Sequence, residues 1–254
     1  MIKGIHNSRR FMSALRAAAR VKPVIVLKVG RHASGTQAAK SHTGALVGSD
    51  DVFDAALRRA GVVRGMRVIS LFSAATTLAC RYRANGDRLL IVTNGGGPAA
   101  MASDRTSDIG TPLAELSGES VSQLDKMLPA TCSKGNPVDV IGDATPERYR
   151  KTVDQVLRDP GVDGVLVILT PQAMTEPAKV ADSMIAIGRE HSKPLLTCWM
   201  GATQVEEGRE MMRTAGIPTL NTPEATLDGV TIEPMVQRPN GRELLVGIVT
   251  DPVL

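Results

Sequence analysis

Short apolar runs rich in β-branched residues alternate with longer, polar-faced stretches along most of the 254 residues. A run in which nearly every position is apolar is typical of a strand buried on both faces of a parallel sheet. When helices separate such strands, the chain forms parallel sheets covered by helices on both faces. We therefore predict an α/β protein built from two flavodoxin-like parallel-sheet domains. The predicted strands are 23–29, 66–70, 88–93, 137–141, 164–170 and 194–200.

The stretches between these runs carry helix signals. Ser8 is expected to cap the first helix, and Gly61 is expected to end the second. Asp50 and Asp51 suit the positive end of that second helix. The expected helices are 9–20, 51–60, 71–83, one starting near Ala99, 117–128, 146–158, 177–190 and 205–215.

Asn85-Gly86-Asp87 is a turn signal within this pattern, and we place a domain boundary there. The first domain is then 1–84 and the second 85–222. In the remaining residues, 223–254, two β-type segments flank an Asn240-Gly241 turn, which predicts a hairpin. A single hairpin is marginally stable in water, so it must pack against another part of a protein.

Composition excludes several classes of function. Aromatic residues make up 2% of the chain, too few for the stacking platforms that bind single-stranded nucleic acid. The net charge of +4 has two interpretations. The excess basic side chains lie on solvated helix faces, which we favour, or they attract phosphate-bearing ligands. No dense basic block indicates nucleic-acid binding, and no apolar run of about 18 residues predicts a membrane span.

The three cysteines, Cys80, Cys132 and Cys198, are far apart and lack the spacing of a zinc site, so no metal site is expected. Reduced, mostly buried thiols are typical of a cytosolic protein. The first residues lack the apolar segment of a signal peptide. We therefore expect a cytoplasmic protein that binds neither nucleic acid nor a membrane.

The segment KSHTGALVGSD places His42 in a loop of small residues after a predicted buried strand. In α/β folds, the loops beyond the carboxyl ends of the strands line ligand sites. A neutral imidazole nitrogen is a competent nucleophile near neutral pH. A lone loop histidine is more often a solvated surface residue, so the pattern by itself leaves both interpretations open.

Asn94, Gly95, Gly96 and Gly97 directly follow the predicted strand 88–93. Three glycines let backbone amides converge on an anion, and the helix after them adds its positive end. The segment lacks the Gly-Lys-Ser/Thr of a Walker A motif and the spacing of a Rossmann motif. The competing interpretation is a tight strand-to-helix turn that needs glycine only for its backbone angles.

Other polar groups also stand near predicted strands. The segment GNPVD offers hydrogen-bonding side chains at Asn136 and Asp139. Thr170-Pro171-Gln172 and Trp199-Met200-Gly201 follow two later strands. These residues either line the same cleft as the glycine-rich turn or merely end their strands.

The segments SHTGALVGSD, TNGGGP, GNPVD, GDATPERY, LVILTPQAMT and CWMG occur together in this order. In this combination the chain resembles the NDP-forming acyl-CoA synthetases, which are relatives of succinyl-CoA synthetase. The ligase-like region of Pat-type protein lysine acetyltransferases shares the same architecture. The resemblance runs from Ile2 to about Thr222, and it implies that the tail 223–254 is one hairpin of an ATP-grasp domain.

The resemblance implies a reaction in which an acid, CoA and ATP give acyl-CoA, ADP and phosphate through a phosphohistidine. It implies that His42 carries the phosphate and that Asn94 to Gly97 bind it. The family uses CoA, ATP or ADP, and Mg²⁺, and we expect none of them to be bound by this chain alone. The residues implied in support are Ser41, Thr43, Gly44, Asn136 and Asp139.

The sequence departs from the family pattern in three places. It lacks the CoA-binding domain that precedes this region in the family, and it contains at most one hairpin of the ATP-grasp domain. Lys3 stands where the family has a glutamate that orients the histidine, and a lysine cannot accept a proton from imidazole. We therefore expect an incomplete enzyme: a remnant, or a subunit whose partner supplies the missing domains, or a homo-oligomer.

Two other interpretations stay open. One is a non-catalytic regulatory or interaction module, as in the ligase-like region of a lysine acetyltransferase. The other is an unrelated flavodoxin-like protein, in which His42 and the turn from Asn94 to Gly97 would lie far apart.

Overall fold

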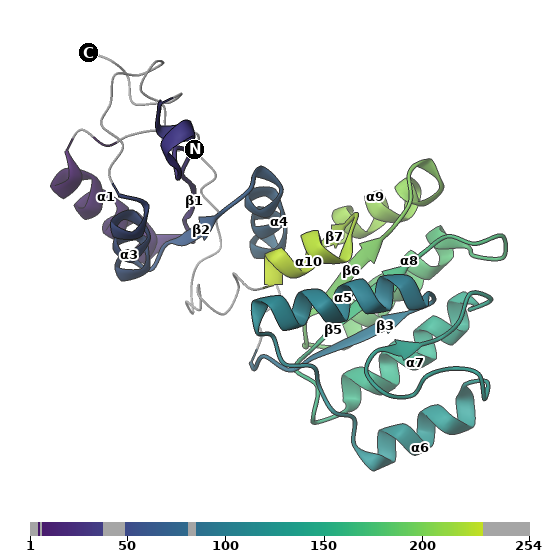
Figure 1. Cartoon of the computed structure of the whole chain (residues 1–254). Helices are drawn as coiled ribbons and strands as arrows, with labels where there is room; N and C mark the ends of the chain where they lie inside the picture. Colours follow the sequence, from purple (N-terminus) through teal and green to yellow (C-terminus); the bar gives the residue numbers. More distant parts are fainter. Residues whose placement is uncertain (1–4, 6, 38–48, 81–84, 231–254) are drawn as a thin grey trace. The chain divides into compact units, whose positions relative to one another are not determined.

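The computed structural model describes residues 5, 7–37, 49–80 and 85–230. Within them the chain divides into two compact units, which we call unit 1 (residues up to 79) and unit 2 (residues 80–230). Each unit combines parallel strands with helices (Figure 1). The predicted α/β class with parallel sheets is confirmed. The predicted C-terminal hairpin lies outside the described residues.

Unit 1 pairs two short parallel strands with three helices, and residues 33–37 are also helical. Its elements are α1 (Ser8–Val21), β1 (Ile25–Leu27), α3 (Asp50–Ala60), β2 (Val63–Gly65) and α4 (Val68–Ala79). Ile25 lies opposite Val63 in the parallel ladder. The buried side chains that α1 and α3 contribute to one core cluster are Leu15, Ala19, Leu57 and Ala60.

Two local predictions for unit 1 are wrong, and one is confirmed. Asn7, rather than Ser8, caps α1: its side-chain oxygen accepts a hydrogen bond from Arg10 N–H at 3.0 Å. The predicted strand 66–70 is largely the first turn of α4, because β2 begins as soon as Gly61 has ended α3. Gly61 has a φ of 67°, the left-handed conformation that favours glycine after a helix.

Unit 2 alternates strands and helices along the whole of its described length. Its elements are β3 (Leu89–Thr93), α5 (Gly96–Ile109), α6 (Gly118–Met127), β4 (Val138–Asp139), α7 (Pro146–Arg158), β5 (Gly164–Leu169), α8 (Pro177–Glu190), β6 (Leu195–Trp199), α9 (Glu206–Thr214), β7 (Thr219–Leu220) and α10 (Pro223–Val230). The strand order is β4-β3-β5-β6-β7, and every described pair is parallel. This is the flavodoxin order, in which the first strand of the chain lies between the second and the third.

Helices cover both faces of the sheet of unit 2, with α5 and α10 together on one side (Figure 1). On that side Ala102 of α5 and Leu227 of α10 pack against strand residues such as Ile91 and Leu166. On the other side, a larger core cluster joins alternate strand residues to α6, α7, α8 and α9. The three central strands, β3, β5 and β6, are buried throughout because helices cover both faces of the sheet there.

The helix α10 contains the first residues of the predicted tail 223–254, and it belongs to unit 2. Arg105 of α5 is paired with Asp228 of α10, whose side chain is 4% exposed. The buried pair ties α10 to α5. The division into 1–84, 85–222 and 223–254 stays a prediction.

Candidate functional site

The strand order of unit 2 creates a natural ligand site beyond the carboxyl ends of β3 and β5. The chain leaves β3 toward one side of the sheet, to β4, and later returns to β5 on the other side. Open α/β sheets bind ligands in the crevice at such a switch point. The predicted phosphate-binding residues Asn94 to Gly97 follow β3 at this place.

The turn after β3 is held by its own backbone and by Thr93. Gly95 N–H donates to Thr93 Oγ1 at 3.1 Å, and the Thr93 hydroxyl lies 3.2 Å from the carbonyl oxygen of Gly95. Thr93 is fully buried. Helix α5 starts at Gly96, three residues earlier than the predicted start near Ala99. Two of the predicted glycines therefore form the first turn of the helix itself.

The amide groups of Gly96 and Gly97 are available to an anion. The first N–H groups of a helix have no acceptor within the helix, and no side chain caps α5. Pro98 has no N–H, and Ala99 N–H already donates to Gly95 O at 3.1 Å. A Cβ added to Gly96 or Gly97 would meet no described atom within 4 Å, and both glycines are exposed, so a ligand can approach this end of the helix.

No ionisable side chain lies between Thr93 and Pro98. The attraction for a negative charge must therefore come from the amide groups and from the positive end of the α5 dipole. Because neither source titrates, the affinity of this turn for an anion does not depend on the protonation of its own residues.

Asn94 fastens the turn to the neighbouring strand. Its side-chain Nδ2 donates to Thr170 O at 2.8 Å, and its Oδ1 accepts from Thr170 N–H at 2.8 Å. Asn94 is 2% exposed. The two hydrogen bonds hold the residue after β3 against the residue after β5. They therefore fix the position at which the glycine-rich segment begins.

Gln172 lies over the same turn. Its Nε2 is 3.4 Å from Asn94 O, and its backbone N–H donates to Thr175 Oγ1 at 2.9 Å. A Cβ added to Gly142 would lie 2.1 Å from Gln172 Oε1, so the Gln172 amide group packs directly on this glycine. The sequence left open whether Thr170–Gln172 lines a cleft, and the structure brings it to the glycine-rich turn.

Asn136 contacts another part of β3. Its Nδ2 donates to Leu89 O at 2.8 Å and Ala114 O at 3.0 Å, and its Oδ1 accepts from Ile91 N–H at 3.0 Å. These groups belong to the first half of the strand and to a loop beside it. The structure therefore does not bring Asn136 to the turn, and it shows this side chain tying backbone segments together.

Asp139 lies level with the end of β3, paired with Thr93 in the ladder between β3 and β4. Its Oδ1 accepts from Ile141 N–H at 2.8 Å. Ile141 has a φ of 58°, an uncommon conformation for a β-branched residue. Asp139 thus shapes the loop that presents Gly142 to Gln172.

The other candidate segment, Trp199–Gly201, is bound by a residue that the sequence analysis did not single out. The guanidinium group of Arg209 donates to Trp199 O and to Gly201 O, each at 2.6 Å. Arg209 is 8% exposed. Its burial gave no sequence signal, because nothing in the local pattern around α9 distinguishes it from the exposed arginines.

His42, Ser41, Thr43, Gly44 and Lys3 lie outside the described residues. Asp50, which follows the His42 segment in the sequence, forms ion pairs with basic residues from both sides of that segment. Asp50 Oδ1 is 3.1 Å from Lys28 Nζ and 2.6 Å from an Arg64 nitrogen, and Asp50 Oδ2 is 3.6 Å from Arg31 Nε. Burial opposes ionisation of Asp50, but the hydrogen bonds from Arg64 and Lys28 outweigh it, and its pKa is lowered.

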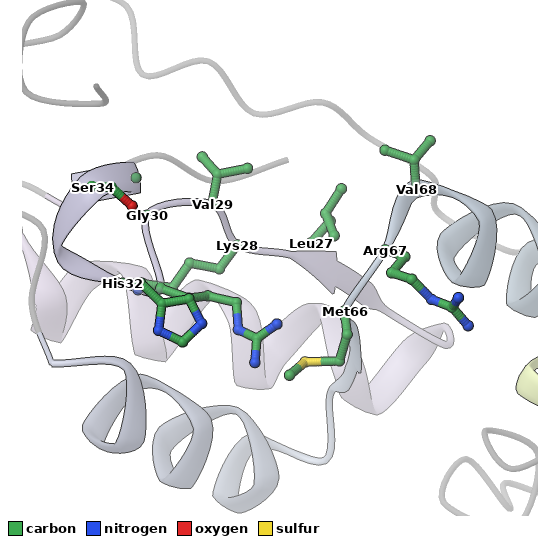
Figure 2. Close-up of a pocket in the computed structure, with 11 residues that line it drawn as sticks. Leu27, Lys28, Val29, Gly30, His32, Ser34, Met66, Arg67 and Val68 are labelled. Carbon is green, nitrogen blue, oxygen red and sulfur yellow. The ribbon is translucent and has the colours of Figure 1, made fainter. Parts of the chain in front are cut away.

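A hollow of about 360 Å³ lies at the carboxyl ends of β1 and β2 in unit 1. Figure 2 shows Leu27, Val29 and Val68 on one side of these strand ends, and Lys28, His32 and Met66 on the other. Lys28 is engaged by Asp50, so its charge is already compensated. Arg31, His32 and Arg67 also line the hollow, and Arg31 Nε lies 3.6 Å from the same Asp50 carboxylate.

The exposed arginines of α1 agree with the favoured interpretation of the basic excess, since Arg9, Arg10, Arg16 and Arg20 are solvated. Nowhere in the described ranges do three or more His, Cys, Asp or Glu side chains gather closely enough to hold a metal ion. None of the described helices is long and apolar enough to cross a bilayer.

Two protein-family models match this chain and show the family to which it belongs. The model of the succinyl-CoA ligase like flavodoxin domain matches residues 1–78, and that of the ligase-CoA domain matches residues 89–232, more than half of the chain. The chain belongs to the family of NDP-forming acyl-CoA synthetases. The resemblance inferred from the motifs is confirmed.

Relatives in this family include ADP-forming acetate–CoA ligases. Ligase I of Archaeoglobus fulgidus is 38% identical over 91% of this chain and 33% of its own length. The alpha subunit of ligase II of Pyrococcus furiosus is 35% identical over 88% of this chain and 50% of its own length. The chain thus spans between a third and a half of these relatives.

A similar solved structure is the dinucleotide-forming acetyl-coenzyme A synthetase 1 of Candidatus Korarchaeum cryptofilum, in complex with phosphate and ADP. Its TM-score is 0.83 at 29% identity, over 92% of this chain and 52% of that one. The structure of the same enzyme without ligands gives a TM-score of 0.82. The fold of this chain is therefore similar to that of about half of the synthetase chain.

Proposed function

We propose that this chain is the phosphate-handling part of an ADP-forming acyl-CoA synthetase, with His42 as the phosphate carrier. The observation that carries the proposal is the pair of open amides at Gly96 and Gly97, at the switch point of the sheet. The match to the family and the presence of phosphate in a similar solved structure support it.

The donor set of the turn fits a phosphate group. Two N–H groups and a helix dipole stabilise an oxyanion without a counter-charge that would have to be displaced. The absence of side chains on Gly96 and Gly97 lets a tetrahedral group approach the backbone. Asn94, buried and bonded to Thr170, keeps the turn in the same geometry whether or not an anion is present.

In the proposed step, a ring nitrogen of neutral His42 attacks the phosphorus of an acyl phosphate. The bond from phosphorus to the acyl oxygen breaks, and the acid leaves as a carboxylate. The phosphoryl group then passes from the histidine to ADP, which regenerates the neutral imidazole. Ser41, Thr43 and Gly44 would leave room around the ring because they are small.

The complete ligation needs groups that bind CoA and the nucleotide. We propose that a second polypeptide, or further domains, supply them, as one P. furiosus relative is an alpha subunit. A homo-oligomer is the alternative arrangement. Mg²⁺ would enter with the nucleotide, since no described cluster of this chain would hold it.

Labelling with radioactive acetyl phosphate tests His42 as the carrier. The wild-type chain should take up a label that is stable in alkali and lost in acid, as expected for phosphohistidine. His42→Ala should take up none, whereas His32→Ala, at an exposed histidine of unit 1, should be labelled like the wild type. An unlabelled wild type would overturn the proposal.

Lys3 favours a second candidate, a non-catalytic module, because it replaces the glutamate that would orient the histidine. In that case the wild type binds acetyl-CoA, nucleotide or a partner without labelling. Lys3→Glu would then restore labelling, and calorimetry would detect the ligand in the wild type. If neither labelling nor binding is seen in either protein, both candidates fail.

A further inference from the structure

The Thr170 hydroxyl group has no hydrogen-bond partner among the described residues. Its Oγ1 is buried from solvent and makes no hydrogen bond within the described residues, although the backbone N–H and C=O of the same residue are both bonded to Asn94. Leaving a buried hydroxyl unpaired is unfavourable, because the group has lost its hydrogen bonds to water. A buried polar atom of this kind calls for an explanation, and one explanation is a water molecule or a ligand that pairs with it.

The Thr170 hydroxyl lies beside the glycine-rich turn. Its oxygen lies 3.6 Å from the position that a Cβ on Gly95 would take, next to the residue at which α5 begins. A group seated on the Gly96 and Gly97 amides would therefore have Thr170 Oγ1 at its side. The hydroxyl is an observation independent of the helix end, since it comes from the residue that follows β5.

Gln172 offers a second donor from the same segment. Its only described side-chain hydrogen bond is the long one to Asn94 O, at 3.4 Å. The side chain is exposed, so rotation of its amide group toward a ligand would break little structure. The reciprocal bonds between Asn94 and Thr170 hold the backbone of this segment at a fixed distance from the turn.

We propose that Thr170 and Gln172 complete the anion site of the turn by donating hydrogen bonds to phosphate oxygens held by the amides of Gly96 and Gly97. The ligand is a tetrahedral phosphate, either free or carried by a side chain. The inference rests on the proposed function, because it adds donors to the same site. It extends the site from one helix end to the ends of two neighbouring strands.

The test is a titration of the full chain with inorganic phosphate, followed by the amide NMR resonances of Gly96 and Gly97. Thr170→Val removes the hydroxyl and keeps the branched shape, and Gln172→Glu places a negative charge beside the anion. Each should weaken phosphate binding on the order of tenfold, the size expected for one charge-assisted hydrogen bond.

Matched controls separate this role from a structural one. Thr152 also carries a buried, unpaired hydroxyl, and Gln123 is exposed on α6. Thr152→Val and Gln123→Glu should leave the affinity for phosphate within about twofold. A merely structural Thr170 hydroxyl predicts a loss of stability in Thr170→Val, whereas an unpaired hydroxyl that serves a ligand predicts equal or greater thermal stability and weaker binding.

The outcomes distinguish the two proposals. If phosphate does not move the Gly96 and Gly97 resonances of the wild type, the turn is not a phosphate site and the proposed function fails with it. If the wild type binds phosphate and both Thr170→Val and Gln172→Glu bind it equally well, only the added donors are ruled out. Repeating the titration after labelling with acetyl phosphate shows whether a carried phosphoryl group, instead of free phosphate, occupies the site.

Discussion

Asn94 and Thr170, which are 76 residues apart in the sequence, hold each other by two hydrogen bonds of 2.8 Å. One side chain satisfies both backbone groups of the other residue. The two hydrogen bonds link the chain just after β3 to the chain just after β5, beyond the last residues that pair in the parallel ladder. They therefore join the two segments that frame the proposed phosphate site.

Asn94→Ala removes both bonds at once. The backbone N–H and C=O of Thr170 lose their partner, so we expect a loss of about 2–4 kcal/mol in the free energy of unfolding. Phosphate binding should weaken as well, because the turn is no longer anchored. Denaturant unfolding measures the first effect, and Asn85→Ala, at an exposed asparagine, should stay within about 0.5 kcal/mol of the wild type.

Gly142→Ala tests whether the position of Gln172 matters. The new Cβ would overlap the Gln172 amide group, which must move away, while the backbone of Gly142 accommodates alanine because its φ is not positive. We expect stability within about 1 kcal/mol of the wild type and weaker phosphate binding. Gly118→Ala, where a Cβ meets nothing, should bind phosphate normally. Unchanged binding in Gly142→Ala would count against the role of Gln172.

Asn136→Ala should separate stability from binding. Loss of its three hydrogen bonds leaves the Ile91 N–H and the Ala114 carbonyl without their described partner, at a cost of about 2–4 kcal/mol, whereas Leu89 O still accepts from Ala114 N–H at 2.8 Å. Because none of these groups belongs to the glycine-rich turn, the folded fraction should bind phosphate with wild-type affinity. A selective loss of affinity would instead place Asn136 in the site, as the family resemblance implied.

Asp50→Ala should destabilise unit 1. Lys28 and Arg64 have side chains only 4% and 8% exposed, and Lys28 would lose its only described carboxylate partner. Breaking such a buried pair costs about 3 kcal/mol. Hydrogen exchange at β1 and β2 should accelerate in this variant. Asp51→Ala, at the exposed neighbouring aspartate, should exchange like the wild type.

Asp159 should contribute to acid sensitivity. Burial opposes its ionisation, but the hydrogen bonds that it accepts from Ser120, Ser117 and Gly161 outweigh burial and lower its pKa. A carboxyl group whose pKa is lower in the folded state stabilises the protein above its unfolded pKa of about 3.9, and this contribution is lost as the pH falls through the folded value.

Asp159→Asn should therefore be less stable than the wild type at pH 7, and the difference should shrink below about pH 4. Chemical unfolding at several pH values measures it. Asp182→Asn, at an exposed position on α8, should follow the wild-type profile throughout. A constant difference at every pH would show that the ionisation of Asp159 is not responsible.

Most elements could be predicted because their signals are local. Runs such as 164–170 are apolar at nearly every position, and Gly61 ends a helix by its own backbone preference. The prediction of a strand at 66–70 failed because the same short segment is compatible with a strand and with the start of a helix. Residues 66–70 are as apolar as a short strand, yet Val68 and Ile69 are exposed on α4, because the strand of this segment had already formed at Val63–Gly65.

The fold class, the family and the place of the glycine-rich turn after a strand could all be inferred from the amino-acid sequence. These follow from periodicity and from motifs whose residues are neighbours in the chain. The folded chain is needed to show that Asn94 bonds Thr170, that Gln172 lies on Gly142, and that Asn136 bonds the first half of β3 and the loop beside it. The strand order β4-β3-β5 brings these distant residues together, and a local pattern contains no information about which strands become neighbours.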